Sequence, residues 1–153
     1  MNEVSKILEE FFHPKSIAIA GVTTDPRTQG NAYLRELTAF NFKGAIYPLH
    51  PKIKEILGLK VYQNLTDVPA QVDMVISCIP AQALPQLLDE CTSKGVKLLH
   101  LYTARLSETG LEEKKVLQNE LVKKARESGI RILGPNCMGL FYAREGLSFL
   151  FSF

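Results

Sequence analysis

A polar loop that follows a short apolar run contains the side chains best suited to bind phosphate. The apolar run SIAIA covers residues 16–20. The candidate ligands after it are Gly21, Val22, Thr23, Thr24, Arg27, Gly30 and Asn31. Threonine hydroxyls and an arginine guanidinium donate hydrogen bonds to phosphate oxygens, and the helix expected at the end of the loop adds free backbone N–H groups. The glycine-rich dinucleotide fingerprint is absent, because Val22 and Thr23 follow Gly21, so the loop predicts a phosphate-binding turn of another type.

The segment after the next expected strand carries a lysine where an NAD-binding protein usually carries an acid. The residues after a strand at 45–47 read PLHPK and end at Lys52. In NAD-binding folds, an Asp or Glu near this point accepts hydrogen bonds from the ribose hydroxyls. A cation at Lys52 instead favours a phosphate on the ribose. NADP and coenzyme A both carry such a phosphate, so both stay open and NAD is disfavoured.

Two further loops are expected at the same edge of the sheet. Ile79, Pro80 and Ala81 follow an apolar strand and form an uncharged lip suited to pack along an adenine or a pantetheine arm, although proline is also common in the first turn of a helix. In the GPNCMG turn, Asn136 can donate and accept hydrogen bonds and adopt left-handed backbone angles. Cys137 has no histidine near it in sequence, so we expect a buried small apolar residue and not a nucleophile.

Strands and helices alternate along the chain. Strands are expected at 16–20, 45–47, 73–80, 96–102 and 130–133, with a small extra strand near 60–62. Helices are expected at 4–12, 31–40, 83–93 and 111–127, with Gly95 and Gly129 ending the last two. This alternation implies right-handed βαβ crossovers and a parallel sheet with helices on both faces. We therefore predict one α/β domain, a Rossmann-like doubly wound parallel sheet that binds its ligand at the carboxyl ends of the strands.

The composition is that of an ordinary globular domain. The 153 residues are 46% hydrophobic and 22% charged with a net charge of +2, so no overall field favours nucleic acid or a membrane surface. No run approaches transmembrane length, and the acidic, amphipathic N-terminus lacks the apolar core of a signal peptide. Three scattered cysteines are typical of reduced thiols and not of a disulfide framework or a zinc site. We expect a cytoplasmic protein that binds no nucleic acid, membrane or metal.

Five motifs, in order along the chain, carry a family resemblance. They are FFHPKSIAIAGVTTDP, GNAYLREL, FKGAIYPLHPK, ILGLKVYQNLTDVPAQVDMVISCIPA and GIRILGPNCMG. Together they resemble the coenzyme A-binding domain of the NDP-forming (ADP-forming) acyl-CoA synthetases, which belong to one superfamily with the alpha subunit of succinyl-CoA ligase. The resemblance covers nearly the whole chain and implies a Rossmann-like fold that binds coenzyme A as a substrate.

The resemblance also implies roles for individual positions. It implies that residues 22–27, Val22 to Arg27, bind the coenzyme A phosphates, with Thr23 and Thr24 as the best candidates. Lys52 would meet the phosphorylated nucleotide end of the coenzyme. Asn136 would lie towards the acyl or phosphate end, and the lining of the coenzyme would be formed by Ile79, Pro80 and Ala81. Three departures stand out. Relatives commonly have Ala-Ser where Val22-Thr23 stands, asparagine where His50 stands, and a glycine-rich segment where YTARLSE places Arg105.

The family also implies parts that this chain lacks. Its members handle an acyl phosphate through a phosphohistidine on a second domain, and an ATP-grasp domain or subunit binds the nucleotide. None of the three histidines matches that phosphohistidine, so we assign no catalytic residue. We expect a coenzyme A-binding domain at 1–146. Residues 147–153 are expected to form either a last strand or the start of a linker to the second domain.

Two alternatives stay open on the sequence. The first is a stand-alone coenzyme A-binding protein with a regulatory or carrier role, although small proteins of that kind generally lack the GPNC turn. The second is an NADP-binding oxidoreductase domain, which would share the sheet and Lys52. The leading hypothesis is a domain that presents the coenzyme A thiol to an acyl phosphate made on other domains.

Overall fold

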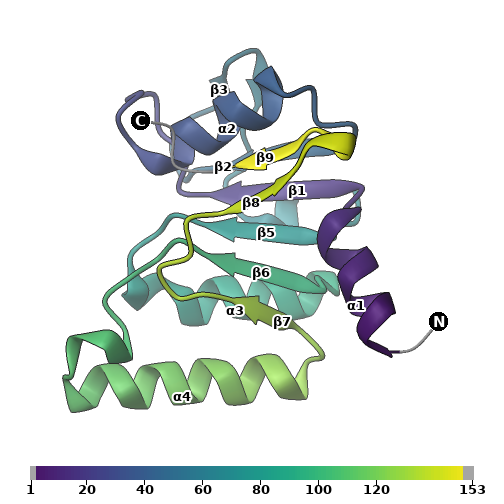
Figure 1. Ribbon diagram of the computed structural model, residues 1–153. Coiled ribbons are helices and arrows are strands. Elements are labelled where there is room, and N and C mark those ends of the chain that lie inside the picture. Colours follow the sequence, from purple (N-terminus) through teal and green to yellow (C-terminus); the bar gives the residue numbers. More distant parts are fainter. Residues whose placement is uncertain (1–2, 150–153) are drawn as a thin grey trace.

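The computed structural model describes residues 3–149 and has a central sheet of five parallel strands (Figure 1). The strand order is β2-β1-β5-β6-β7. The strands are β1 (Ser16–Ala20), β2 (Ala45–Leu49), β5 (Met74–Ser77), β6 (Leu98–Leu101) and β7 (Arg131–Leu133). Chain order reverses at β1, because β2 lies on one side of it and β5 on the other. The predicted Rossmann-like sheet is therefore confirmed, and its switch point lies between β1 and β5.

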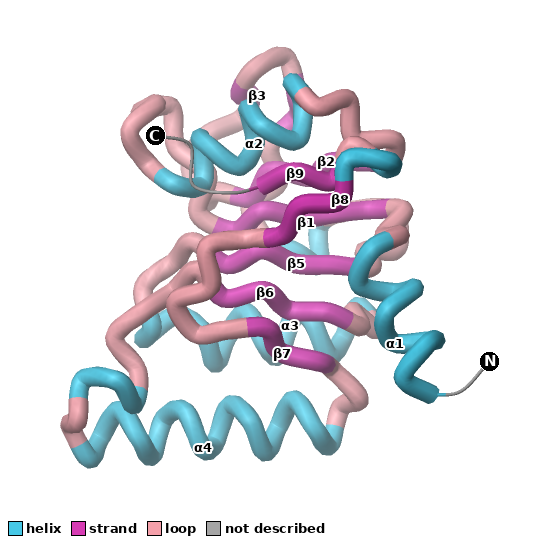
Figure 2. The backbone as a smooth tube through the Cα atoms, in the orientation of Figure 1, coloured by secondary structure: helices cyan, strands magenta, loops and turns pink. Residues whose placement is uncertain are grey.

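Helices cover both faces of this sheet, as Figures 1 and 2 show. The helices are α1 (Glu3–Phe12), α2 (Gln29–Ala39), α3 (Leu84–Lys94) and α4 (Glu112–Glu127). The short strands are β3 (Glu55–Ile56), β4 (Leu59–Lys60), β8 (Leu140–Tyr142) and β9 (Leu147–Phe149). Single 3-10 turns are η1 (Leu65–Asp67), η2 (Ala81–Ala83), η3 (Ser107–Thr109) and η4 (Ala143–Glu145). Helices α3 and α4 cover one face, and α2 with the β8–β9 hairpin covers the other.

The central strands are buried on both faces, which explains their continuous apolar sequences. In β1, Ala18 and Ala20 belong to the core under α3 and α4. Ile17 and Ile19 belong to the opposite core, under α2 and β9. Because successive side chains of a strand point to opposite faces, a polar residue at any of these positions would be buried. These strands therefore have no exposed face on which a polar side chain could be placed.

Several element boundaries differ from the predicted ones. Strand β2 continues through Pro48 to Leu49, which is tolerated because β2 is an edge strand and proline lacks only the outward N–H. Strand β5 ends at Ser77, three residues earlier than predicted. The small strand near 60–62 is in fact the β3–β4 hairpin, and Tyr62 forms only an isolated bridge to Leu49. The helix ends at Gly95 and Gly129 are confirmed, and both glycines have left-handed backbone angles.

The last described segment returns over the sheet. Strand β8, which the sequence did not predict, pairs antiparallel with β9. Leu147 and Phe149 of β9 are fully buried against the α2 side of the sheet. Residues 150–153 of the expected terminal strand or linker lie outside the described residues.

Two types of feature are missing from the described part of the chain. No helix within residues 3–149 is long and apolar enough to cross a membrane. No three His, Cys, Asp or Glu side chains in the same range are grouped closely enough to hold a metal ion.

Candidate functional site

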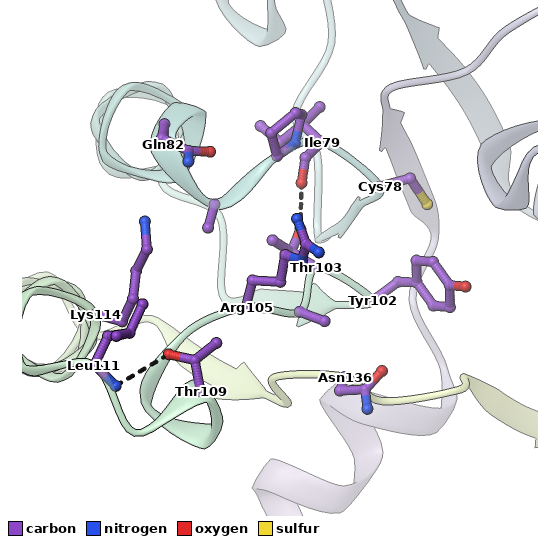
Figure 3. A pocket seen from close by; sticks show the side chains of 13 residues that line it. Cys78, Ile79, Gln82, Tyr102, Thr103, Arg105, Thr109, Leu111, Lys114 and Asn136 are labelled. Carbon is purple, nitrogen blue, oxygen red and sulfur yellow. Dashed lines mark hydrogen bonds between the residues drawn. The ribbon is translucent and has the colours of Figure 1, made fainter.

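The loops after β1, β2, β5 and β6 surround two neighbouring clefts at the carboxyl edge of the sheet. The larger cleft, of about 670 Å³, lies between the β5–α3 loop and the start of α4 (Figure 3). The smaller cleft, of about 310 Å³, lies between the ends of β1 and β2 and the start of α3. Ile79 and Pro80 line both clefts. A single elongated ligand can therefore extend from one cleft to the other over these two residues.

The turn between β1 and α2 is too tight for any side chain at two positions. Gly21 has a φ of +92°, and a Cβ there would lie 2.8 Å from the carbonyl oxygen of Cys78. A Cβ on Gly30 would lie 2.4 Å from the carbonyl oxygen of Gly21. The start of α2 is thus held directly against the end of β1. Both glycines were predicted as site residues, and their role in the structure is to permit this close approach.

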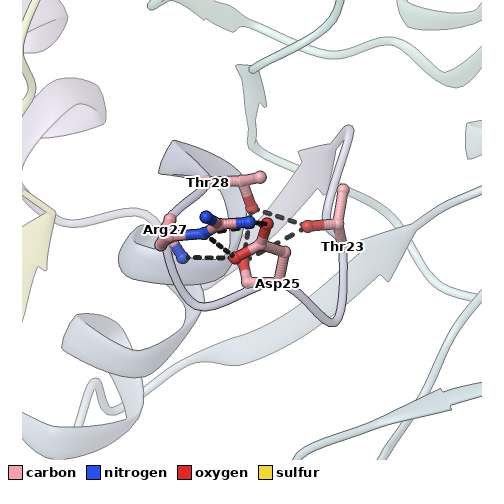
Figure 4. A network of polar contacts seen from close by, with 4 residues as sticks. All are labelled: Thr23, Asp25, Arg27 and Thr28. Carbon is pink, nitrogen blue, oxygen red and sulfur yellow. Dashed lines mark hydrogen bonds and ion pairs between the residues drawn. The ribbon is translucent and has the colours of Figure 1, made fainter.

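The β1–α2 loop holds its own shape through polar contacts (Figure 4). The hydroxyls of Thr23 and Thr28 lie 2.6 Å apart, and the Thr28 hydroxyl donates to the carbonyl oxygen of Asp25 at 2.9 Å. Arg27 Nη2 donates to Asp25 Oδ2 at 2.7 Å, and this contact lowers the pKa of the Asp25 carboxyl. Thr23 and Arg27, both predicted phosphate ligands, are therefore engaged within the loop, whereas Thr24 is exposed.

The first turn of α2 offers backbone donors instead. Thr28 is its N-cap residue, but its side chain caps no helical N–H group. The Asn31 side chain donates to the carbonyl oxygen of Thr23 at 2.8 Å and accepts from Arg35 at 3.0 Å, so it braces the loop. Uncapped N–H groups and the positive end of the helix dipole favour an anion at this point. The sequence analysis did not predict Thr28 as the residue at which α2 begins, although threonine just before a helix is a recognisable N-cap signal.

At the end of β2, a histidine shapes the turn that carries the predicted cation. His50 Nδ1 accepts hydrogen bonds from the backbone N–H groups of Lys52 and Ile53, both at 3.1 Å. An accepting Nδ1 leaves the ring proton on Nε2. His50 also lines the smaller cleft, and Lys52 is exposed on the turn next to it. No ion pair of the Lys52 ammonium is found among residues 3–149.

The lip between the two clefts is fixed by a buried pair of hydroxyls. Ser77 Oγ and Thr103 Oγ1 lie 2.8 Å apart, and Thr103 Oγ1 also donates to the carbonyl oxygen of Ile79 at 2.8 Å. Because β5 ends at Ser77, the chain from Cys78 onward leaves the sheet and can line the clefts. Thr103 was not predicted as a site residue. Its signal in the sequence is a polar side chain directly after an apolar strand, at the edge where ligands bind.

Asn136 closes the far side of the larger cleft. Its φ is +51°, the left-handed conformation that the sequence favoured, and its backbone N–H donates to the carbonyl oxygen of Thr103 at 3.1 Å. Gly134, which has a φ of +125°, keeps this turn against β6, since a Cβ there would lie 2.6 Å from the carbonyl oxygen of Leu101. The exposed carboxamide of Asn136 therefore stands at the wall of the cleft.

The Cys78 thiol does not have the surroundings of a nucleophile. Cys78 lines the larger cleft, and burial raises the pKa of its thiol to about 12. A thiol with such a pKa carries almost no thiolate at neutral pH. Cys137 is half-buried instead of buried as expected, and its Sγ lies 3.9 Å from the carbonyl oxygen of Gly139.

The structure brings most of the predicted site residues to one edge, but not into one cleft. Gly21, Ile79 and Pro80 line the smaller cleft, and Ile79, Pro80, Ala81 and Asn136 line the larger one. The side chain of Val22 is fully buried in the core, so only its backbone can face a ligand. Gly30 and Asn31 are also buried, whereas Thr24, Arg27 and Lys52 are exposed and line neither cleft.

Comparison with known proteins gives a consistent result. The family model described as CoA binding domain matches residues 15–143. The chain is 40% identical over 148 residues to the Acetate–CoA ligase [ADP-forming] I subunit alpha of Pyrococcus furiosus, covering 94% of this chain and 32% of that protein. It is 37% identical over 145 residues to the Acetate–CoA ligase [ADP-forming] II subunit alpha of the same organism, covering 95% of this chain and 31% of that protein.

A solved structure agrees with these relatives. The dinucleotide forming Acetyl-coenzyme A synthetase 1 of Ca. Korarchaeum cryptofilum, solved in complex with phosphate and ADP, superposes with a TM-score of 0.88 and 38% identity. The match covers 94% of this chain and 30% of that one. The chain thus spans about a third of the length of these relatives. It belongs to the CoA binding domain family and is homologous to the coenzyme A-binding domain in the alpha subunits of ADP-forming acyl-CoA synthetases.

Proposed function

We propose that this chain binds coenzyme A along the carboxyl edge of the sheet and presents its thiol to an acyl phosphate formed elsewhere in an ADP-forming acyl-CoA synthetase. The observation that carries this proposal is that Ile79 and Pro80 line both clefts. Coenzyme A is elongated, with a phosphorylated nucleotide at one end and a thiol at the other. An uncharged lip between two clefts suits the pantetheine arm that joins those ends.

The diphosphate would lie at the start of α2. The first-turn N–H groups of this helix have no side-chain cap, and the exposed Thr24 lies on the loop before them. Arg27 can add a charge-assisted hydrogen bond only if its guanidinium leaves the Asp25 carboxylate. Because both side chains of that ion pair are at the surface, exchanging one anion for another costs little. Gly21, Gly30 and Asn31 would act by keeping this turn compact.

The phosphate on the ribose would meet Lys52. The turn after β2 is held by His50, so the lysine is carried on an ordered backbone beside the smaller cleft. A ribose phosphate distinguishes coenzyme A from its dephospho form. NADP also carries a ribose phosphate, on the 2′ hydroxyl instead of the 3′ hydroxyl, so the choice between coenzyme A and NADP depends mainly on the lip and the larger cleft.

The thiol end would enter the larger cleft beside Ala81 and Asn136. Burial raises the pKa of the Cys78 thiol in the same cleft and so disfavours its thiolate, and the nucleophile we propose is the thiol of the coenzyme itself. The Asn136 carboxamide can donate to an oxygen of the acyl group or of its phosphate. Through the larger cleft the bound coenzyme would face the partner that carries the acyl phosphate.

The remaining parts of the reaction belong to other domains or subunits. Because the chain spans about a third of its relatives, we propose that a phosphohistidine domain and an ATP-grasp domain or subunit complete the enzyme. The domain division at residue 146 belongs to the same proposal. We also propose a cytoplasmic location, which is supported by the free thiols of Cys78, Cys91 and Cys137.

Replacing Lys52 by alanine tests the nucleotide end of this proposal. In the wild type, coenzyme A should bind about tenfold more tightly than dephospho-coenzyme A, the effect of one charge-assisted contact. Lys52→Ala should remove that difference by weakening coenzyme A alone. Isothermal titration of both ligands on both proteins measures the ratio of their dissociation constants.

Lys54→Ala is the matched control, because Lys54 is an exposed lysine two residues further along the same loop. This variant should keep the wild-type ratio. The assignment of Lys52 is wrong if the control changes the ratio as much, or if Lys52→Ala weakens both ligands equally.

A further inference from the structure

The larger cleft has one basic wall, formed by the β6–α4 segment. Arg105 and Lys114 line the cleft, and neither Asp nor Glu is among its lining residues. Figure 3 shows Lys114 extending from α4 towards Gln82 and Arg105 extending towards Ile79. Both cations therefore point from one wall of the cleft towards the other. The smaller cleft differs, since Glu90 lines it.

The backbone around Arg105 fixes where this side chain starts. Arg105 has a φ of +68°, an uncommon conformation for a residue other than glycine. The carboxylate of Glu108 accepts hydrogen bonds from the backbone N–H groups of both Arg105 and Leu106. The Leu106 side chain is 1% exposed and anchors the next position in the core. The Glu108 carboxylate is thus bonded to the backbone of this turn, and no ion pair of the Arg105 guanidinium is found within residues 3–149.

Lys114 is the more enclosed of the two cations. Its side chain is only 18% exposed. Its ion pair with Glu113 has an N–O distance of 4.0 Å, and that glutamate side chain is 75% exposed. A contact of this length to a solvated carboxylate neutralises little of the charge. An anion between Arg105 and Lys114 would therefore meet two cations with little competition from protein carboxylates.

The rest of the cleft is apolar or neutral. Ile79, Pro80, Ala81 and Leu111 provide carbon surface, and Gln82 and Asn136 provide neutral polar groups. A short alkyl chain that ends in an anion matches this combination, because its methylene groups can pack against the apolar side chains and its charge can pair with the two cations. A small acyl group such as acetyl would offer no negative charge to either cation.

We propose that the larger cleft receives an acyl group that ends in a carboxylate, with Arg105 and Lys114 as its counter-ions. This inference rests on the proposed function, since it is the coenzyme that would carry the acyl chain into the cleft. It adds the substrate class: the thioester formed would be that of a dicarboxylic acid. The same two cations could also attract a phosphate of the coenzyme, so the test must separate these two sources of negative charge.

The test compares two stable thioethers of coenzyme A that differ only at the chain end. S-carboxypropyl-coenzyme A ends in a carboxylate, and S-butyl-coenzyme A ends in a methyl group. Isothermal titration of the wild type should show the carboxylate compound binding about tenfold more tightly. The double variant Arg105→Gln/Lys114→Gln should reduce this preference to about twofold or less. Lys115→Gln, which removes an exposed cation outside the cleft, should keep the preference.

Each other outcome overturns a specific statement. Equal binding of the two thioethers to the wild type overturns the carboxylate site. If the double variant weakens coenzyme A and both thioethers by the same factor, the cations bind a phosphate of the coenzyme and the inference is wrong. If coenzyme A itself does not bind to the wild type, the proposed function fails, and this inference fails with it.

Discussion

Replacing Gly30 by alanine is expected to destabilise the domain by about 2–3 kcal/mol, the usual cost of overpacking. In an ordinary helix the same change stabilises by about 1 kcal/mol. The sign reverses here because the new Cβ would lie 2.4 Å from the carbonyl oxygen of Gly21. Helix α2 would have to move away from β1. The same movement displaces the first-turn N–H groups, so affinity for coenzyme A should fall at least about tenfold.

Urea unfolding followed by circular dichroism measures the first effect, and titration with coenzyme A measures the second. Gly58→Ala is the control, because Gly58 has a φ of +75° and nothing lies within 4 Å of the position that a Cβ would take there. It should cost only about 1–2 kcal/mol, the cost of a left-handed non-glycine residue, and should leave coenzyme binding intact. A Gly30→Ala protein as stable as the wild type would contradict the close approach of α2 to β1.

The second large effect is a loss of stability in acid that depends on one buried histidine. His100 is 0% exposed, and the backbone of Cys137 is a polar neighbour whose effect on the ring is smaller than that of burial. It packs edge-to-face against Phe149, with ring centroids 5.0 Å apart. Burial lowers the pKa of His100 to about 4, from an ordinary value of 6.5. The folded chain therefore keeps this ring neutral, while the unfolded chain takes up a proton below pH 6.5.

It follows that protonation of this histidine does not affect stability well above pH 6.5, and that it destabilises the fold increasingly as the pH falls from 6.5 to about 4. The total loss from this group is up to about 3 kcal/mol, since one unit of pKa corresponds to about 1.4 kcal/mol. His100→Leu should remove this part of the pH dependence. Urea unfolding at about pH 7, 5.5 and 4, values that span the interval between the two pKa values, gives the difference in stability between the two proteins.

A non-titrating control comes from the same strand. Leu98→Val removes one methylene group from a buried side chain, so it should lower stability by the same amount at every pH. If the wild type and His100→Leu lose stability in parallel on acidification, His100 is not the group responsible.

The sequence was sufficient to predict the central sheet because its strands are buried on both faces. Continuous apolar runs such as SIAIA and MVIS leave little ambiguity, and glycines at 95 and 129 mark where helices must end. The predicted end of β5 was wrong because Cys78 and Ile79 are as apolar as the strand before them, so the sequence gives no sign that the strand stops at Ser77. Strand β8 was missed because its residues are partly exposed and it forms only through pairing with β9.

The position of the candidate site could also be predicted, but its internal contacts could not. Topology alone brings the carboxyl ends of parallel strands to one edge. The bond from Thr103 to Ile79, in contrast, joins residues 24 positions apart on neighbouring loops. The hydrogen bond from Arg27 to Asp25 depends on the folded shape of the loop. The sequence could therefore suggest Arg27 as a phosphate ligand, but it could not show that Arg27 is paired with Asp25.

Isothermal titration of the unmodified chain with coenzyme A and, separately, with NADP decides whether this domain binds coenzyme A. Both ligands carry a diphosphate and a ribose phosphate. They differ in the position of the ribose phosphate, which is 3′ in coenzyme A and 2′ in NADP, and in the group beyond the diphosphate. We expect one coenzyme A bound per chain and no binding of NADP at tenfold higher concentration. Binding of NADP without binding of coenzyme A would contradict the proposed function, and would show that the two clefts hold a nicotinamide dinucleotide instead.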